Sequence, residues 1–219
     1  MRAPAWRRHP DRGPAGANEA DRAAEAAPTK GAVMAGVVVL AADGFETIEC
    51  LTSVDVLRRG GVRTTLASIM DTREVITAQQ ISVTCDCTFD EVDFSEYDYV
   101  VLPGGMPGTT NLRRDPRVCE VVREFMAEKH VAAICAAPSI LAELGLLEGR
   151  RATCFPGFDK DFPEGVFAGE RTVVVDGNLI TASGMGLALP FALAILNDIA
   201  GEKAVQKVCN GIQLPEAQA

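Results

Sequence analysis

One cysteine, Cys135, lies in a local pattern that suits a nucleophile. The apolar run 131–134 ends at this cysteine, and two alanines and Pro138 follow, which predicts a strand, a tight turn and the start of a helix. Small residues fit such an elbow, and a proline is tolerated in a first helical turn. At a helix N-terminus, unpaired backbone N–H groups and the helix dipole favour thiolate over thiol, so the sulfur is expected to be nucleophilic and oxidisable.

A second interpretation of Cys135 stays open at this point. Free cysteines are among the most buried residue types, so Cys135 also fits a small apolar residue at the end of a core strand. The elbow pattern occurs in serine hydrolases too, where glycines flank the nucleophile. The segment alone does not decide between these interpretations.

Two acids and two glycines are candidates for the same chemistry. Glu46 and Glu49 are three residues apart at the predicted start of a helix, which places both on one face, although acids there often only complement the helix dipole. Gly104 and Gly105 follow an apolar run and form either a simple tight turn or an oxyanion hole of backbone N–H groups. Together with Cys135, these residues predict a site for acyl or carbonyl chemistry.

Alternating strands and helices must position these residues. Helical spacing predicts amphipathic helices, and apolar or β-branched runs predict buried strands, a short β excursion and a hairpin. The strands cover residues 36–42, 62–69, 97–102, 131–134, 172–175 and 179–182, the excursion 75–85, and the helices 45–59, 117–129, 139–146, 187–199 and 202–208. This order predicts an α/β fold with a mostly parallel sheet covered on both faces. Ligands bind at the carboxyl ends of such strands, where all the candidates lie.

Composition indicates an ordinary soluble protein with a single domain at residues 34–219, since 47% of the residues are hydrophobic and 23% charged. Residues 1–33 are rich in Arg, Ala, Pro and Gly and are predicted to be a disordered tail, with Met34 as an alternative start. Residues 1–30 carry six Lys/Arg and four Asp/Glu, so the net charge of -9 leaves -11 for the rest. This acidic balance argues against nucleic-acid binding.

Cysteine and histidine usage favours a reduced, cytoplasmic protein without a metal. The seven cysteines include no Cys-x-x-Cys pair, and the only histidines are His9 and His130, which excludes zinc-finger spacing. No secretory core segment is present, and no run approaches the roughly 18 apolar residues of a membrane span.

The combined motifs resemble the ThiJ/PfpI family, in particular the branch of the Parkinson-associated deglycase and bacterial YajL. The resemblance covers about residues 36–209 and is carried by Glu46-x-x-Glu49, by Val-Asp55, by the run Val-Val-Leu-Pro-Gly-Gly that ends at Gly105, and by Ala-Ala-Ile-Cys-Ala-Ala-Pro around Cys135. It implies a flavodoxin-like three-layer sandwich, a homodimer, and neither metal nor organic cofactor.

The resemblance also implies roles for individual residues. Cys135 takes the position of the family's reactive cysteine, and Glu49 that of the carboxylic acid that hydrogen-bonds it. The backbone N–H groups of Gly105 and Ala136, next to Gly104, line an anion pocket, and Glu46 is a second pocket-side acid.

Several positions depart from related branches. Ala136 follows the cysteine where protease-like relatives have histidine, so a Cys-His peptidase pair is missing. Phe155 stands where the animal branch has a pocket histidine, as in the YajL branch, and Gln79 and Ser183 replace arginines of the animal protein. His130 is expected at the wrong end of its strand to take part.

The other cysteines are weaker candidates. Cys154, next to Phe155, is either a pocket-edge or resolving thiol or simply buried. Cys85 and Cys87 alternate on a predicted strand and so face opposite ways, which disfavours a disulfide. The remaining three, Cys50, Cys119 and Cys209, are expected to pack in helices.

The resemblance implies a cofactor-independent glyoxalase or deglycase-type enzyme. It would act on methylglyoxal, glyoxal or glycated adducts through Cys135, with Glu49 as acid and base, and protect against carbonyl and oxidative stress. The alternative is a redox-responsive sensor or chaperone-like stress protein in which Cys135 is oxidised to sulfinate and catalysis is vestigial.

Overall fold

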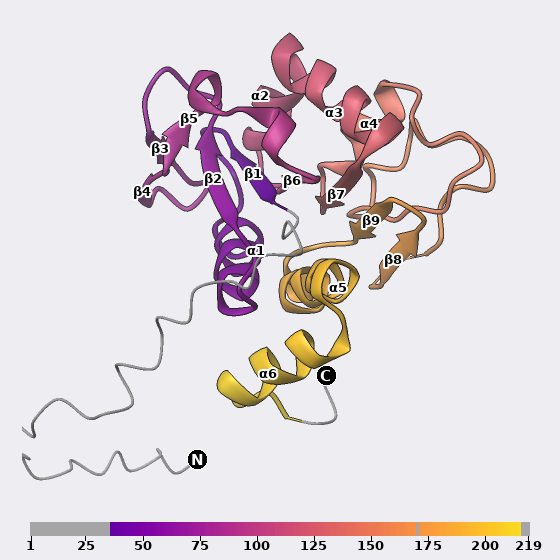
Figure 1. Ribbon diagram of the computed structural model, residues 1–219. Helices are drawn as coiled ribbons and strands as arrows, with labels where there is room; N and C mark the ends of the chain where they lie inside the picture. The colour runs from indigo at the N-terminus through magenta and orange to yellow at the C-terminus, as the bar shows by residue number, and fades with distance from the viewer. Residues whose placement is uncertain (1–35, 170, 216–219) are drawn as a thin grey trace, which may run out of the picture. The chain divides into compact units, whose positions relative to one another are not determined.

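A seven-stranded sheet forms the centre of the molecule (Figure 1). The computed structural model describes residues 36–169 and 171–215. The strand order is β5-β2-β1-β6-β7-β9-β8, and every neighbouring pair is parallel except the β8–β9 hairpin. The strands are β1 (Val37–Ala41), β2 (Thr64–Ser68), β5 (Cys87–Thr88), β6 (Tyr99–Leu102), β7 (His130–Ile134), β8 (Val173–Asp176) and β9 (Leu179–Ala182). The parallel pairs bring the carboxyl ends of β1, β6 and β7 to one edge.

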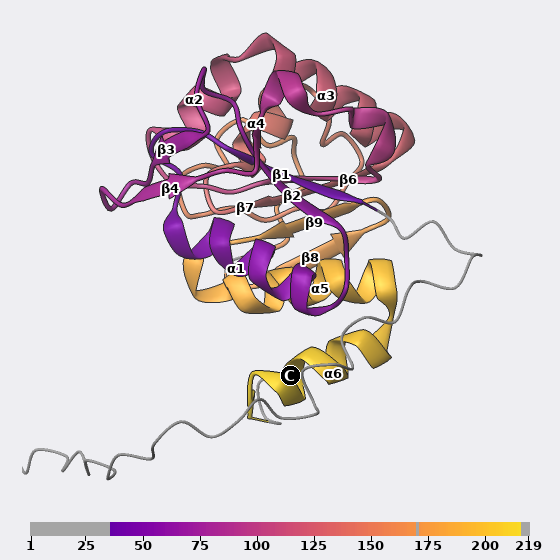
Figure 2. The ribbon, with the colours of Figure 1, turned by 60° about the vertical axis from the view of Figure 1, so that its left-hand side comes forward.

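Helices cover both faces of the sheet (Figure 2). One face carries α1 (Thr47–Arg59) and α5 (Ala188–Ala200), with α6 (Glu202–Gly211) packed on α5. The other carries α2 (Gly108–Arg114), α3 (Pro116–Glu128) and α4 (Pro138–Glu143). Short 3-10 helices occur at Phe89–Glu91, Phe94–Glu96 and Met185–Leu187.

The central strand β1 shows why the sheet needs two helical layers. All five of its residues are fully buried. Because side chains alternate along a strand, Val37 and Val39 pack in one core with α1 and α5 residues, whereas Val38 and Leu40 pack in another with α3 residues. This arrangement confirms the predicted three-layer α/β fold.

The structure corrects several predicted elements. The excursion at 75–85 is an antiparallel pair, β3 (Glu74–Ile76) and β4 (Ser82–Thr84), separate from the main sheet. Helix α2 was not predicted, because its short sequence follows a Pro- and Gly-rich loop. Helix α4 ends at Glu143, before the predicted boundary, because Gly145 has a left-handed φ of +72° and its N–H donates to the Ala142 carbonyl.

Cys85 and Cys87 do not share a strand, contrary to the prediction. Cys85 follows β4, whereas Cys87 opens β5. The intervening Asp86 turns the chain, since its carboxylate accepts hydrogen bonds from the Leu66 N–H and from Arg58. All seven cysteines are free thiols.

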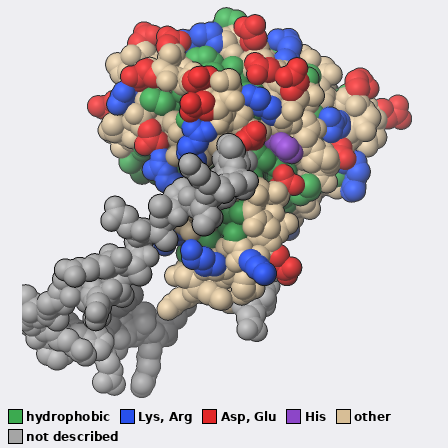
Figure 3. Space-filling model, viewed as in Figure 1, with side chains coloured by type: hydrophobic (Ala, Val, Ile, Leu, Met, Phe, Trp, Pro, Cys, Tyr) green, Lys and Arg blue, Asp and Glu red, His purple; other side chains and the backbone are tan. Residues whose placement is uncertain are grey.

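The surface is polar and mixed in charge. Figure 3 shows Lys/Arg and Asp/Glu side chains interspersed over one face. No helix among the described residues is long and apolar enough to cross a membrane. The predicted tail at residues 1–33 and the alternative start at Met34 lie outside the described residues.

Candidate active site

Cys135 lies at a sharp elbow between β7 and α4. The strand ends at Ile134 and the helix begins at Pro138, as predicted. Cys135 itself has a φ of +63°, a left-handed conformation that costs a non-glycine residue of order 1 kcal/mol and is concentrated at functional sites. Its N–H donates to the Ala182 carbonyl over 2.8 Å, and its carbonyl accepts from the Phe155 N–H over 2.8 Å. These bonds to two separate segments hold the elbow.

Glu49 reaches the same place from α1. Its side chain is fully buried, and its Oε2 accepts a hydrogen bond of 2.9 Å from the Gly104 N–H. The other oxygen, Oε1, is buried without a hydrogen-bond partner among the described residues. A carboxyl with one unused oxygen is suited to exchanging a proton with a ligand.

Gly104 lies between the acid and the thiol. A Cβ at this position would lie 2.6 Å from Cys135 Cβ and 2.7 Å from Glu49 Oε2, so the acid and the cysteine approach each other only because the residue between them has no side chain. The fold thus brings Glu49, Gly104 and Cys135 together from the ends of β1, β6 and β7.

Backbone N–H groups also surround the sulfur. Those of Ala136 and Gly105 donate towards Cys135 and oppose the rise of its pKa. Gly105 has a φ of +89°, and a Cβ there would lie 2.3 Å from the Glu46 nitrogen, so this approach requires glycine. N–H groups that favour the charged sulfur are the kind of donor that an oxyanion pocket uses.

Glu46 caps helix α1. Its Oε2 accepts a 2.7 Å hydrogen bond from the Glu49 N–H, and the residue is 9% exposed. The contact orients the first turn of α1. Glu46 is therefore a positioning residue for Glu49, and its negative charge contributes to the raised pKa of Glu49.

Burial raises the pKa of Glu49 from 4.5 to about 7. Loss of water around the carboxylate is the main cause. The Gly104 N–H and the Cys135 thiol act in the opposite direction, while the charge of Glu46 adds to the rise. An acid with this pKa gains and loses protons readily near neutral pH.

The pKa of Cys135 differs from the sequence-based prediction. Burial, followed by the charge of Glu49, raises it to about 12. The N–H groups of Ala136 and Gly105 lower the pKa, as predicted, but their effect is smaller than that of burial and of Glu49. Helix α4 has only six residues and so contributes a weak dipole. Ionisation of the thiol is therefore disfavoured while Glu49 carries its negative charge.

Comparison with known proteins shows the family. The model of the DJ-1/PfpI family matches residues 35–198 of the chain. The chain belongs to the DJ-1/PfpI family. Protein dj-1beta of Drosophila melanogaster is 34% identical over 177 residues, which cover 80% of this chain and 95% of the relative.

Two further proteins are similar to this DJ-1/PfpI protein. A deglycase of Pyrococcus abyssi is 37% identical over 149 residues, which cover 67% of this chain and 88% of the relative. The structure of oxidised DJ-1 from Toxoplasma gondii is similar with a TM-score of 0.78 and 31% identity, covering 82% of this chain and 98% of that chain.

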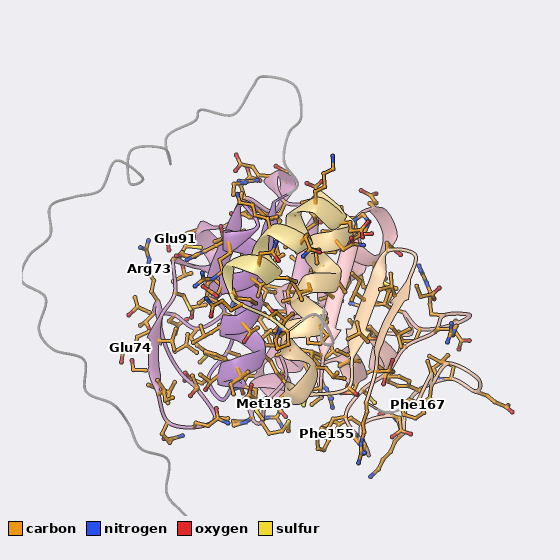
Figure 4. The ribbon with its side chains drawn as sticks, turned by 90° about the horizontal axis from the view of Figure 1, so that it is seen from below. Arg73, Glu74, Glu91, Phe155, Phe167 and Met185 are labelled. Atoms are coloured by element: carbon orange, nitrogen blue, oxygen red, sulfur yellow. The ribbon has the colours of Figure 1, made fainter. Side chains whose placement is uncertain are left out.

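An open cavity adjoins the Cys135 elbow of this DJ-1/PfpI protein. Its volume is about 530 Å³, and the backbone of Cys135 is hydrogen-bonded to one of its lining residues, Phe155. Figure 4 shows Phe155 and Met185, which both line it, at the same edge of the molecule. The lining consists of Phe155, Pro156, Arg171, Ser183, Gly184, Met185, Gly186 and Leu187.

Other candidate residues lie outside the site. Cys154, considered for the pocket edge, is fully buried and does not line this cavity. His130 opens β7 at the opposite end of the sheet, as expected, where its ring stacks on Tyr99. Gln79 accepts a hydrogen bond from the Thr47 hydroxyl. The described residues contain no group of three or more His, Cys, Asp or Glu arranged to hold a metal ion.

Sequence reasoning missed Arg171. The residue precedes a short strand and belongs to no periodic pattern, so it carried no local signal. Its place in the cavity depends on the β8–β9 hairpin and on the segment after α4, which meet only in the folded chain.

Proposed function

We propose that this protein is a cofactor-independent enzyme of the glyoxalase or deglycase type, which converts methylglyoxal or glyoxal to a 2-hydroxy acid through Cys135. One observation carries the proposal: an acid with a pKa of about 7 is buried beside a thiol at a strained elbow. The name deglycase, which the relative from Pyrococcus abyssi carries, supports an activity of this type.

The first step uses the pair of Glu49 and Cys135. As the sulfur attacks the aldehyde carbon, ionised Glu49 takes the thiol proton. The electron pair of the C=O bond moves to oxygen, where the N–H groups of Gly105 and Ala136 stabilise the developing negative charge. Glu49 returns its proton to this oxygen, which completes a hemithioacetal.

The second step moves hydrogen within the bound substrate. Glu49 removes the proton from the former aldehyde carbon, which gives an enediol, and delivers it to the neighbouring carbonyl carbon, while the hemithioacetal hydroxyl proton passes to the oxygen of that carbonyl. These transfers convert the hemithioacetal to a thioester of the 2-hydroxy acid. Water then cleaves the carbon–sulfur bond, which releases the acid and restores the thiol. The net reaction adds one water molecule and needs no external oxidant or reductant.

The test is lactate formation from methylglyoxal without glutathione. We expect turnover in the wild type and its loss in Cys135→Ser and Glu49→Gln. Cys119→Ser is the matched control, because Cys119 is another partly exposed thiol but lies on α3. Full turnover in Cys135→Ser refutes the mechanism.

The same experiment separates the redox-responsive alternative. The two N–H donors at the Cys135 sulfur also suit the oxygens of a sulfinate. Absence of wild-type turnover, together with rapid conversion of Cys135 to sulfinate by peroxide, favours a sensor over an enzyme.

We further propose that the chain acts as a homodimer, the association that its resemblance to the family implies. Support comes from an open apolar groove on α1, lined by Ile48 and Leu51, with Leu189 of α5 and Ile212 after α6. Ile48 is 48% exposed, unusual for a large apolar side chain. Light scattering of the wild type and of Ile48→Glu tests this: we expect a dimer that the substitution weakens, and a wild-type monomer refutes it.

A further inference from the structure

The cavity beside Cys135 is larger than methylglyoxal requires. Its volume of about 530 Å³ falls in the range of sites for larger small molecules. Phe155 and Met185, on its walls, are 47% and 49% exposed, which leaves apolar surface open to a ligand. A three-carbon aldehyde would fill only a small part of this volume.

Arg171 is the only Lys or Arg among the described residues that line the cavity. Two hydrogen bonds hold the next residue, Thr172: its N–H donates to Ser183 Oγ over 3.1 Å, and its carbonyl accepts from the Ser183 N–H over 3.2 Å. This pairing extends the β8–β9 register and sets Arg171 alongside Gly184.

Gly184 keeps the space between Arg171 and the aromatic wall open. A Cβ at position 184 would lie 3.3 Å from the Phe155 ring, so any side chain there would fill the gap. The cavity therefore has an apolar wall and a cation separated by a residue without a side chain. Such a combination suits an apolar chain that ends in an anion.

The charge of Arg171 is not neutralised within the described part of the chain. Six of the ten other described arginines form salt bridges, namely Arg58, Arg59, Arg63, Arg73, Arg113 and Arg117, but none of those ten lines the cavity. Arg171 forms no salt bridge with any carboxylate of residues 36–169 and 171–215. Its backbone is also left-handed, with a φ of +54°, a conformation of order 1 kcal/mol above the usual one. A guanidinium that lines the cavity without a carboxylate partner in the described part of the chain is available to a ligand carboxylate, which an arginine can bind in a bidentate manner.

We propose that Arg171 binds a terminal carboxylate of the substrate, so that the preferred substrates are α-oxoaldehydes with an acid group at the far end of a short carbon chain. The inference rests on the proposed function, because it places the aldehyde at Cys135. The apolar wall formed by Phe155 and Met185 contacts the chain. The protein has a net charge of -9, which disfavours anions in general, so a local cation is needed to select them.

The test compares two substrates of the same shape. These are 4,5-dioxopentanoate and 5-methyl-2-oxohexanal, in which an isopropyl group replaces the carboxylate. We expect Arg171→Ala to lower kcat/KM about tenfold for the first, the loss typical of one charged hydrogen bond, and to change the second less than about twofold. Arg171→Lys retains part of the preference.

Arg151→Ala is the matched control, since Arg151 is exposed but outside the cavity. We expect it to leave both substrates unchanged. An equal loss on both substrates in Arg171→Ala, or no loss on either, overturns the inference while leaving the proposed function intact.

A binding measurement makes the inference independent of turnover. Calorimetry with Cys135→Ser compares 2-hydroxyglutarate with 2-hydroxy-5-methylhexanoate, the two expected products, with and without Arg171→Ala. A preference for the dicarboxylate that disappears in Arg171→Ala supports the inference, even where neither aldehyde is turned over. Absence of turnover would refute only the proposed function. If the Cys135→Ser protein that retains Arg171 shows no preference for the dicarboxylate, the inference is overturned.

Discussion

Glu49→Gln should remove a loss of stability that the wild type undergoes as the pH rises. The pKa of Glu49 rises from 4.5 to about 7 in the folded protein, and each pKa unit corresponds to about 1.4 kcal/mol. The folded state thus holds this proton more tightly than the unfolded state by about 3 kcal/mol.

The sign of the stability change depends on whether the folded or the unfolded state ionises at the lower pH. Below about pH 4.5 the carboxyl is neutral in both states, and its contribution to stability is fully present. As the pH rises towards 7 the unfolded chain ionises first, so the wild type loses stability, and above about 7 the loss is complete. Glutamine does not ionise, so Glu49→Gln avoids this loss.

Urea unfolding between pH 4.5 and 8.5 measures the difference. We expect the free energy of unfolding of Glu49→Gln, relative to wild type, to grow by about 3 kcal/mol across this range and then to level off. Glu74→Gln is the control, because Glu74 is exposed at the start of β3 (Figure 4). A difference independent of pH, or one that shrinks as the pH rises, would refute the argument that burial controls this acid.

Three further predictions follow from single contacts. Gly104→Ala should reduce kcat/KM about a hundredfold, because the added Cβ would lie 2.6 Å from Cys135 Cβ and displacing reacting groups by about 1 Å has an effect of this size. Gly211→Ala is the control: no atom lies within 4 Å of its added Cβ, so steady-state kinetics should be unchanged. Glu49→Gln should lower the pKa of Cys135, because a neighbouring negative charge is lost. Alkylation of the variant by iodoacetamide should therefore reach half its maximal rate at a lower pH than in wild type. An unchanged dependence of the alkylation rate on pH contradicts this prediction. Tyr99→Phe should lower the free energy of unfolding by about 1 kcal/mol, because the buried hydroxyl donates to Asp198; equal unfolding curves would show that this bond adds nothing.

The sequence by itself was sufficient for the fold and for the elbow at which Cys135 lies. Continuous apolar runs such as Val37–Ala41 predict strands buried on both faces, and these need helices on both sides. The cysteine elbow was also predictable, because the end of an apolar run, small residues and Pro138 are all local signals. Short elements such as α2 were not predictable, since seven residues after a Gly- and Pro-rich loop carry little periodicity.

Only the tertiary structure decided the electrostatics of the site. The pattern at Cys135 predicts a lowered thiol pKa, yet burial and Glu49 raise it, and neither is encoded in the neighbouring residues. Glu49 and Gly104 are 55 positions apart in the chain, and Arg171 meets the wall formed by Phe155 through a hairpin and a loop. Desolvation and charge depend on what surrounds a group in space, and local patterns report only what surrounds it along the chain.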